Sequence, residues 1–317
     1  MEDNILVTKG LKKYFGTPKG MLHAVDDIDL SIRRGTTLGV VGESGCGKST
    51  LGRTILQLIK PTSGQIIFDG KDVTNLSKSE MAQFRRDAGI IFQDPYASLN
   101  PRLTAFELIE EPLIVNKTYK TKQEQQEAVF KMMEINGLPP RLINSYPHEL
   151  DGGRRQRIGI ARTLVLNPKF IVCDEPVSAL DVSIQAQILN LLMDLQDARQ
   201  LSYIFITHDL SVVKHISHEI MVMYMGVCVE RAEKNELFAN PIHPYTKALL
   251  AAIPVPDLSS KGKRREIIKG EVTSPINLKP GCRFAPRCPY ACEKCMADEN
   301  VKLRDLGNDH YVACAVI

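Results

Sequence analysis

A glycine-rich segment near the start of the chain has the residue types and the spacing that phosphate chemistry requires. It reads Gly42-Glu43-Ser44-Gly45-Cys46-Gly47-Lys48-Ser49 and fits the pattern G-x-x-x-x-G-K-[ST]. Glycines there let backbone N–H groups approach phosphate oxygens, and the positive end of a following helix attracts the same anion. We expect Lys48 to reach the β- and γ-phosphates of a nucleotide and the Ser49 hydroxyl to ligate Mg²⁺, and we count Thr50 among the nucleotide-binding residues. The alternative is a glycine-rich turn without a ligand.

Two adjacent carboxylates follow an apolar run at residues 170–173. Asp174 and Glu175 are therefore expected at the carboxyl edge of a sheet, where α/β proteins bind ligands. Asp174 suits the coordination shell of Mg²⁺, and Glu175 suits a base that orients or deprotonates an attacking water. His208 also ends an apolar run, and its imidazole could sense or stabilise a γ-phosphate. The alternative for Asp174 and Glu175 is a pair of surface carboxylates without a ligand. The alternative for His208 is a structural role, which is the more common one for a single histidine at a strand end.

Cysteines gather in the last stretch of the chain. Of the eight cysteines, five crowd together there: Cys282, Cys288, Cys292, Cys295 and Cys314. In a reducing cytosol such a cluster indicates a metal site rather than a disulfide framework. The segment after about residue 240 is also rich in proline and lacks periodicity. We therefore expect an irregular extension that a bound metal would have to stabilise. Zn²⁺ and an iron–sulfur cluster both suit sulfur ligands, and buried thiols without a metal are the remaining alternative.

The elements that must position these groups alternate between strands and helices. Apolar runs predict buried strands at residues 36–42, 64–69, 88–93, 170–173 and 203–206. Helical spacing follows Lys48, with Leu51, Ile55, Leu56 and Ile59 on one face, and recurs at residues 184–198. Such alternation implies a largely parallel sheet covered on both faces. Residues 104–163 are mostly helical in pattern and are expected to form a subdomain inserted into this α/β core.

Composition excludes several classes of protein. The 40 Lys and Arg residues nearly balance the 37 Asp and Glu residues, which gives a net charge of +3 and argues against nucleic acid as the main partner. No run of 18 apolar residues is present, so no membrane-spanning helix is expected. The first residues lack the basic and apolar regions of a signal peptide. We expect a soluble, cytosolic chain that serves a membrane only by docking to other chains.

In this order, the motifs at residues 4–240 resemble the ABC transporter ATPase family. Gln93, before Asp94-Pro95, resembles the Q-loop of the family, which contacts Mg²⁺, and His208 resembles its switch histidine. Phe15 lies where the family stacks an aromatic ring on adenine, with Tyr14 as the fallback. The D-loop of the family resembles Ser178-Ala179-Leu180-Asp181. The resemblance implies a P-loop NTPase core with a mostly parallel sheet, a small antiparallel β subdomain and an inserted helical subdomain.

The signature segment of that family departs from its usual form in this chain. The usual Leu-Ser-Gly-Gly-Gln corresponds to Leu150-Asp151-Gly152-Gly153-Arg154. In the family this segment opens a helix and faces the γ-phosphate that the opposite subunit holds. Asp151 replaces a hydroxyl donor with a negative charge, which Arg154 can offset, and an aspartate is also a good helix N-cap. We hypothesise a heterodimer with unequal sites, in which the partner's phosphate loop faces Asp151 and is catalytically poorer.

The C-terminal extension, residues 241–317, resembles that of oligopeptide and dipeptide importer ATPases, after a nucleotide-binding domain at residues 1–240. Segments 240–250 and 281–289 carry the resemblance, and Ser274-Pro275-Ile276-Asn277 is closer to the F-type subunit. The resemblance implies a [4Fe–4S] cluster, with Zn²⁺ as the rival, on Cys282, Cys288, Cys295 and Cys314. Cys292 has no counterpart in the family pattern and is counted as spare.

The resemblance implies an ATP-hydrolysing subunit that powers uptake of di- or oligopeptides. Its expected partners are a second, non-identical ATPase subunit, two integral membrane permease subunits and an extracytoplasmic peptide-binding protein. The expected location is the cytoplasmic face of the cell membrane, as a peripheral protein. The alternatives are an ABC ATPase without a transport function, an importer ATPase for another solute such as nickel, and a regulatory subunit that binds nucleotide without useful turnover.

Overall fold

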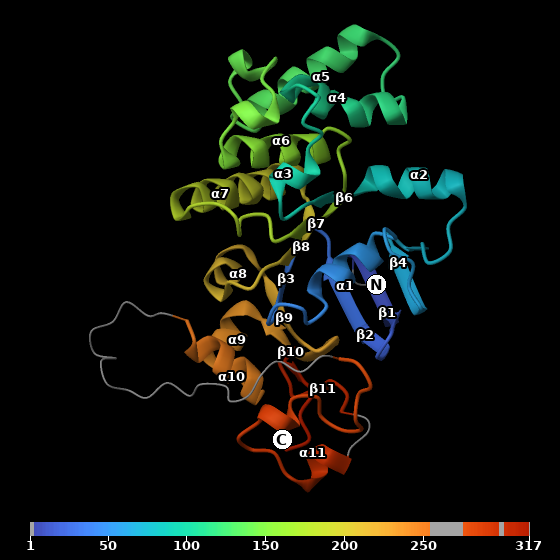
Figure 1. The fold of residues 1–317 in the computed structure, drawn as a ribbon, viewed down its shortest axis with the longest axis vertical. Helices are drawn as coiled ribbons and strands as arrows, with labels where there is room; N and C mark the ends of the chain where they lie inside the picture. Colours follow the sequence, from blue (N-terminus) through green and yellow to red (C-terminus); the bar gives the residue numbers. More distant parts are fainter. Residues whose placement is uncertain (1–2, 254–274, 298–300, 317) are drawn as a thin grey trace, which may run out of the picture. The chain divides into compact units, whose positions relative to one another are not determined.

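The computed structural model describes residues 3–253, 275–297 and 301–316 and divides into two compact units (Figure 1). One unit consists of Met1–Ile5, Ile32–Thr36 and Phe68–Ile206, and we call it the helical unit. The other consists of Leu6–Ser31, Thr37–Ile67 and Thr207–Ile317, and we call it the phosphate-loop unit. Ser274, which belongs to the Ser-Pro-Ile-Asn pattern, lies outside the described residues.

A sheet forms the centre of the phosphate-loop unit. Strand β3 (Thr37–Val41) is buried along its whole length and pairs in parallel with β9 (Glu219–Tyr224), with Val41 opposite Val222. Strand β10 (Val227–Glu233) pairs antiparallel with β9 on one side and with β12 (Tyr311–Val312) on the other. Strand β11 (Arg304–Asp305) pairs with β12, so the order is β11-β12-β10-β9-β3. The end of the chain thus extends the sheet that begins with β3.

The same unit contains a hairpin and several short helices. Strands β1 (Asn4–Thr17) and β2 (Gly20–Arg33) are joined by two residues, which makes them an antiparallel hairpin, and β4 (Ser63–Phe68) pairs with β1. Helix α1 (Lys48–Ile55) follows the glycine-rich loop. The other helices of this unit are α8 (Leu210–Ile216), α9 (Lys234–Ala239), α10 (Pro244–Ala251), the 3-10 turn η4 (Ala285–Arg287) and α11 (Glu293–Ala297).

Three aromatic rings join the C-terminal extension to the core of this unit. Tyr245 and Phe284 from the extension are buried against Tyr224 of β9. The ring centroid of Tyr224 lies 4.7 Å from that of Tyr245 and 5.3 Å from that of Phe284. Each such side chain removes a large apolar area from water, so the extension is held by a core that it shares with β3, α8 and β9 as well as by backbone pairing.

The helical unit contains three parallel strands in the order β8-β7-β6. Its strands are β6 (Ala88–Ile91), β7 (Phe170–Asp174) and β8 (Ser202–Ile206), and both β7 and β8 are buried throughout. The preceding elements are β5 (Lys71–Asp72) and α2 (Lys78–Asp87). Helix α7 (Val182–Arg199) connects β7 to β8, as a parallel pair requires.

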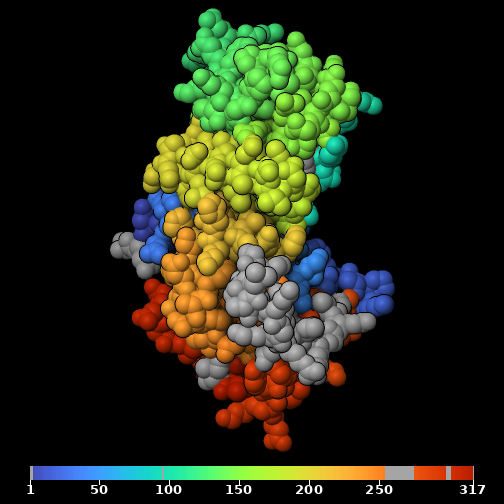
Figure 2. All heavy atoms as spheres, turned by 90° about the vertical axis from the view of Figure 1, so that its left-hand side faces the viewer, coloured from blue at the N-terminus to red at the C-terminus, as the bar shows by residue number. Residues whose placement is uncertain are grey.

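A block of helices lies between β6 and β7 in the sequence. It consists of α3 (Pro95–Ser98), α4 (Ala105–Asn116), α5 (Lys122–Ile135), the 3-10 turns η1 (Pro140–Leu142) and η2 (Pro147–Glu149), and α6 (Gly152–Leu164). Capping boxes at Thr104 and Thr121 fix where α4 and α5 begin. Figure 2 shows the atoms of α4 and α5, in green, gathered together.

These elements agree with most of the expected ones and correct some boundaries. All five expected strands are present, and residues 104–163 form the expected inserted helices, interrupted between α5 and α6. Helix α1 ends at Ile55, so Ile59 lies outside the helix whose face it was expected to share. Strand β6 ends at Ile91 and leaves Gln93 on the following loop rather than in the strand. None of the helices in the described part of the chain has the length and apolar character that crossing a membrane requires.

Candidate functional site

The phosphate loop is closed around the side chain of its own lysine. Lys48 is 5% exposed, and its Nζ donates to the carbonyl oxygens of Gly42 at 2.8 Å and of Glu43 at 3.0 Å. Gly47, at φ 106°, is the N-cap of α1, and a Cβ there would lie 1.9 Å from the carbonyl oxygen of Ala24. The loop therefore needs glycine for steric reasons, and it leaves a cation at the start of a helix, where a phosphate group is favoured.

Residues of the C-terminal extension hold Glu43, the second residue of this loop. The Glu43 backbone N–H donates to the Tyr245 hydroxyl at 2.8 Å. The Glu43 carboxylate accepts two bonds from the Arg287 guanidinium, at 2.7 and 2.9 Å, and Arg287 is only 7% exposed. Arg287 also donates to the Tyr224 hydroxyl at 3.3 Å. Two parallel N–H···O bonds fix both the position and the orientation of the carboxylate.

The hairpin places the two aromatic candidates for adenine on opposite faces of β1, as successive residues of a strand must be. Tyr14 stacks on His23 with ring centroids 4.0 Å apart, and its hydroxyl donates to Asp26. The Lys13 ammonium lies over the ring of Phe15, 4.7 Å from its centroid. The Tyr14 ring is therefore already stacked and its hydroxyl already bonded.

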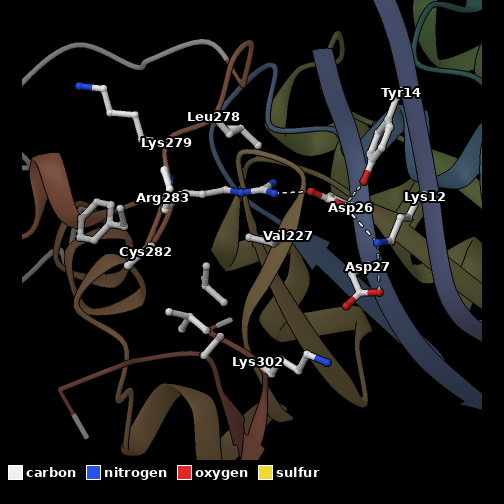
Figure 3. Close-up of a pocket in the computed structure, with 16 residues that line it drawn as sticks. Lys12, Tyr14, Asp26, Asp27, Val227, Leu278, Lys279, Cys282, Arg283 and Lys302 are labelled. Atoms are coloured by element: carbon white, nitrogen blue, oxygen red, sulfur yellow. Dashed lines mark hydrogen bonds and ion pairs between the residues drawn. The ribbon is translucent and has the colours of Figure 1, made fainter. Parts of the chain in front are cut away.

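A cavity of about 350 Å³ borders Tyr14 and is lined by the hairpin, β10 and the C-terminal extension (Figure 3). Arg283 points across it to Asp26, where Tyr14 also converges. Burial alone raises the pKa of Asp26, but hydrogen bonds from Tyr14, His23 and Arg283 outweigh it and hold that pKa below its usual value. The phosphate loop is not among the residues that line this cavity.

The acidic pair lies in the helical unit, at the carboxyl end of β7 as expected. Asp174 is 1% exposed, whereas Glu175 is half-buried and has φ 49°, an uncommon conformation for a residue with a side chain. Gln93, on the exposed loop after β6, donates its side-chain N–H to Glu175 Oε2 at 2.9 Å. The structure thus brings Gln93 and Glu175 together, although 82 residues separate them. Strained backbone of this kind is typical of functional sites.

Asp151 acts as the N-cap of α6. Its Oδ1 accepts from the Arg154 backbone N–H at 2.8 Å, and its Oδ2 lies 3.3 Å from Arg154 Nη1. Both side chains are well exposed, at 59% and 42%. The pair therefore presents a nearly neutral, solvated surface at the start of the helix, with Leu150 buried behind it. Gly153 packs against Ile184 of α7, where a Cβ would lie 2.8 Å from its side chain, and Gly152 faces Leu180.

The remaining expected residues lie at the starts of helices. Asp181 caps α7 by accepting from the Ile184 N–H at 3.0 Å, after the segment that contains Ser178, Ala179 and Leu180. His208 is exposed, one residue before Asp209, the N-cap of α8. The other loop residues expected at phosphate or magnesium differ in exposure: Ser44 and Gly45 are exposed, Cys46 is buried, and Ser49 and Thr50 are half-buried.

All eight cysteines are free thiols, and the five C-terminal ones lie in one region. Cys292 Sγ lies 3.8 Å from Cys295 Sγ, and the Cys282 N–H donates to the Cys295 carbonyl at 2.8 Å. Burial raises the pKa of Cys282, and the nearby sulfurs of Cys295 and Cys314 raise it further. In the described part of the chain, no three His, Cys, Asp or Glu side chains are arranged closely enough to hold a metal ion.

Four functional candidates were not expected from the sequence. Arg287 and Tyr245 contact the phosphate loop, and Arg283 and Asp26 form an ion pair beside the hairpin. Tyr245 lies 202 residues from Glu43 and Arg287 lies 244 residues from it. No spacing pattern connects residues so far apart in the chain. The local signal is that Tyr245, Arg283 and Arg287 lie in the segments 240–250 and 281–289, which carry the resemblance to importer ATPases.

Comparisons with known proteins agree on one family. The family description "ABC transporter" matches residues 25–178, and "Oligopeptide/dipeptide transporter, C-terminal region" matches residues 229–295. The oligopeptide transport ATP-binding protein AppF of Bacillus subtilis is 48% identical over 99% of this chain and 97% of its own. The oligopeptide transport ATP-binding protein OppF of Salmonella typhimurium is 52% identical over 90% of this chain and 85% of its own.

A solved structure supports the same fold. The ATP-binding cassette MJ0796, a dimer in a post-hydrolysis state with ADP and phosphate, aligns with a TM-score of 0.67 at 30% identity. The alignment covers 72% of this chain and 98% of that one. Both the cassette and the extension thus have relatives of known type. The chain belongs to the ABC transporter ATP-binding proteins that carry the oligopeptide/dipeptide transporter C-terminal region.

Proposed function

We propose that this chain binds and hydrolyses MgATP and thereby powers the uptake of di- or oligopeptides through an ABC importer. The observation that carries the proposal is the loop Gly42–Ser49, which wraps the start of α1 around the buried Lys48 ammonium. Identity of about half over nearly the whole chain with oligopeptide transport ATP-binding proteins supports peptide as the cargo. As a peripheral protein on the cytoplasmic face of the membrane, the chain docks to two permease subunits. A peptide-binding protein on the other side of the membrane delivers the peptide to these permease subunits.

Each site residue has a role under this proposal. Lys48 moves from the loop carbonyls to the β- and γ-phosphates, and Phe15 stacks on adenine. Ser49, Asp174 and Gln93 are oxygen ligands that suit Mg²⁺, which neutralises charge on the phosphates when bound. Glu175 orients the attacking water, and His208 contacts the γ-phosphate. The segments 150–154 and 178–181 face the nucleotide of the opposite subunit.

Activity of the assembled complex tests this function. We expect ATPase activity that rises when the binding protein and a peptide are added, and we expect Lys48→Ala to abolish both ATPase and uptake. ATPase activity that is stimulated by nickel or a sugar instead of a peptide would contradict peptide as the cargo. Turnover that no solute changes would favour an ABC ATPase outside transport.

We further propose that the complex contains two non-identical ATPase subunits with unequal sites. Phosphate loop, acidic pair and His208 are complete in this chain, whereas Asp151 and Arg154 alter its signature. The site that contains this chain's own loop is therefore the active one, and the partner's loop faces an aspartate. The test is to make Glu175→Gln here and the equivalent change in the partner, separately. The proposal predicts a much larger loss from Glu175→Gln, and equal losses would refute it.

The cysteines of the extension are proposed to hold a [4Fe–4S] cluster, with Zn²⁺ as the rival. The support is chemical, because soft thiolates suit both metals; in the described part of the chain no three of these side chains are arranged closely enough to hold a metal ion, so binding would have to draw them together. Cys288 completes the set of four, and Cys292 is left as the spare thiol. The cluster joins segments that are separated in the sequence, so its contribution is structural or redox-sensing.

Anaerobic purification distinguishes the two metals. A [4Fe–4S] cluster is expected to give a broad absorbance band at about 400 nm and about four iron atoms per chain. Colourless protein that contains zinc would overturn the cluster in favour of a Cys₄ zinc site. Protein that contains neither metal would mean that the thiols are unligated.

A further inference from the structure

We propose that Arg287 is a positioning residue of the nucleotide site, which makes the C-terminal extension part of the apparatus that binds MgATP. The inference rests on the proposed ATPase function and concerns a contact that the family's loop motif does not include. Its starting point is the Arg287–Glu43 ion pair, which joins the extension to the second residue of the phosphate loop at 2.7 and 2.9 Å.

Every polar group of Glu43 is occupied, and the extension occupies two of the three. The Glu43 N–H donates to Tyr245, the Glu43 carboxylate accepts from Arg287, and the Glu43 carbonyl accepts from Lys48 at 3.0 Å. The lysine that must reach the phosphates is thus bonded to a residue that the extension holds still. A loop fixed before its ligand arrives loses less conformational freedom when it binds.

Charge gives the ion pair a second effect. Glu43 places a carboxylate in a loop whose expected ligand is a triphosphate, and like charges at short range oppose binding. The Arg287 guanidinium compensates this carboxylate, and its low exposure of 7% reduces screening by water. Loss of Arg287 would leave Glu43 as an uncompensated negative charge beside the phosphates.

The surroundings of Arg287 are built to hold it in place. Phe284, three residues earlier, is buried against Tyr224 and Tyr245, and Tyr224 also accepts from Arg287 at 3.3 Å. Arg283 forms a second anchor of the same segment by its ion pair with Asp26 and its bond to the Met225 carbonyl (Figure 3). Both arginines lie in the short segment between Cys282 and Cys288, so this segment meets the rest of the phosphate-loop unit at two points.

An ion pair elsewhere in the same unit supplies a matched control. Arg231 donates to both oxygens of Glu219, at 2.7 and 2.8 Å, with exposures of 13% and 24%. The Arg287–Glu43 pair is also bidentate, through the two terminal nitrogens of Arg287 rather than Nε and one terminal nitrogen, and has exposures of 7% and 21%. Glu219 lies on β9 and not in the phosphate loop. Loss of either arginine should lower stability to a similar degree, but only loss of Arg287 should weaken nucleotide binding.

The experiment measures the dissociation constant of MgATP for the full-length chain, with a fluorescent ATP analogue, together with the melting temperature. We expect Arg287→Met to raise that constant at least about fivefold, whereas Arg231→Met leaves it within about twofold of wild type. Adding Glu43→Gln to Arg287→Met removes the uncompensated charge and should restore affinity to within about threefold of wild type. Arg287→Lys, which keeps the charge but not the fork, should lie between wild type and Arg287→Met.

Two results would overturn the inference. One is an Arg287→Met affinity equal to that of Arg231→Met, and the other is a double variant that binds no better than Arg287→Met. Should Arg287→Met fail to fold, Arg287→Gln replaces it with the same expected values. The two proposals can be tested separately. Failure of the wild-type protein to bind MgATP contradicts the proposed function. Equal MgATP affinities of the wild-type protein and Arg287→Met contradict only the role of Arg287.

Discussion

Restoring the usual signature in this chain should activate the weaker of the two proposed sites. The perturbation is the double substitution Asp151→Ser and Arg154→Gln, made in a complex whose active site is already disabled by Glu175→Gln. Under the proposed asymmetry, residual ATPase in that background comes from the partner's loop, which faces the altered signature. We expect the double substitution to raise this residual rate at least about tenfold.

The magnitude follows from charge and not from folding. Two unit charges about 4 Å apart interact by about 4 kcal/mol at an effective dielectric constant near 20. Arg154, 3.3 Å from Asp151, cancels part of this repulsion. If one third remains, about 1.4 kcal/mol, the rate changes about tenfold. Serine caps a helix about as well as aspartate, and an ion pair this exposed contributes at most about 1 kcal/mol, so stability should change little.

The assay is steady-state ATPase of the complex, with the melting temperature recorded for each variant. Asp151→Asn in the same background is the matched control, because it keeps an N-cap side chain and removes only the charge. It should recover a large part of the gain. A residual rate that stays unchanged in both variants would refute the electrostatic reasoning and leave helix capping as the sole role of Asp151.

Three other predictions concern single residues. Gln93→Glu replaces the amide that donates to Glu175 with a second carboxylate, and the like charges should lower the steady-state ATPase rate at least about tenfold. Phe15→Ala should weaken MgATP binding about tenfold, whereas Tyr14→Phe should leave it within about twofold and cost about 1 kcal/mol of stability by urea titration. Burial lowers the pKa of His243 to about 4, so its contribution to stability is complete above the unfolded pKa near 6.5 and is lost as pH falls towards 4. In urea titrations, about 2 kcal/mol of the free energy of unfolding should disappear between about pH 7.5 and pH 5, and His243→Asn should flatten that pH dependence.

The α/β core and the inserted helices could be predicted because their signals are local. The runs that became β7 and β8 are apolar at every position, and such strands are buried on both faces. The helix after Lys48 and the loop before it form one motif with a known backbone path. The end of β6 was placed two residues too late, because Phe92 continues the apolar run although the chain has already left the sheet.

The contacts that hold the phosphate loop could not be predicted, because they depend on distant segments. The hairpin of β1 and β2 has long strands with many charged residues, so alternation alone does not distinguish it from exposed loops. The end of the chain reaches the sheet through only two residues of β12, opposite Glu230 and Arg231. A pairing of two residues leaves no recognisable sequence pattern, so the path of the extension could not be predicted. The positions of Arg287 and Tyr245, which depend on that path, could not be predicted either.

The central claim is that the loop beginning at Gly42 binds a triphosphate through Lys48. Equilibrium binding of MgATP to the full-length chain, wild type beside Lys48→Ala, tests it most directly. The account predicts saturable binding by the wild-type protein and a loss of at least about tenfold in affinity in the variant, with an unchanged melting temperature in the absence of nucleotide. Equal affinities of the two proteins, or no binding by a folded wild-type chain, would contradict it.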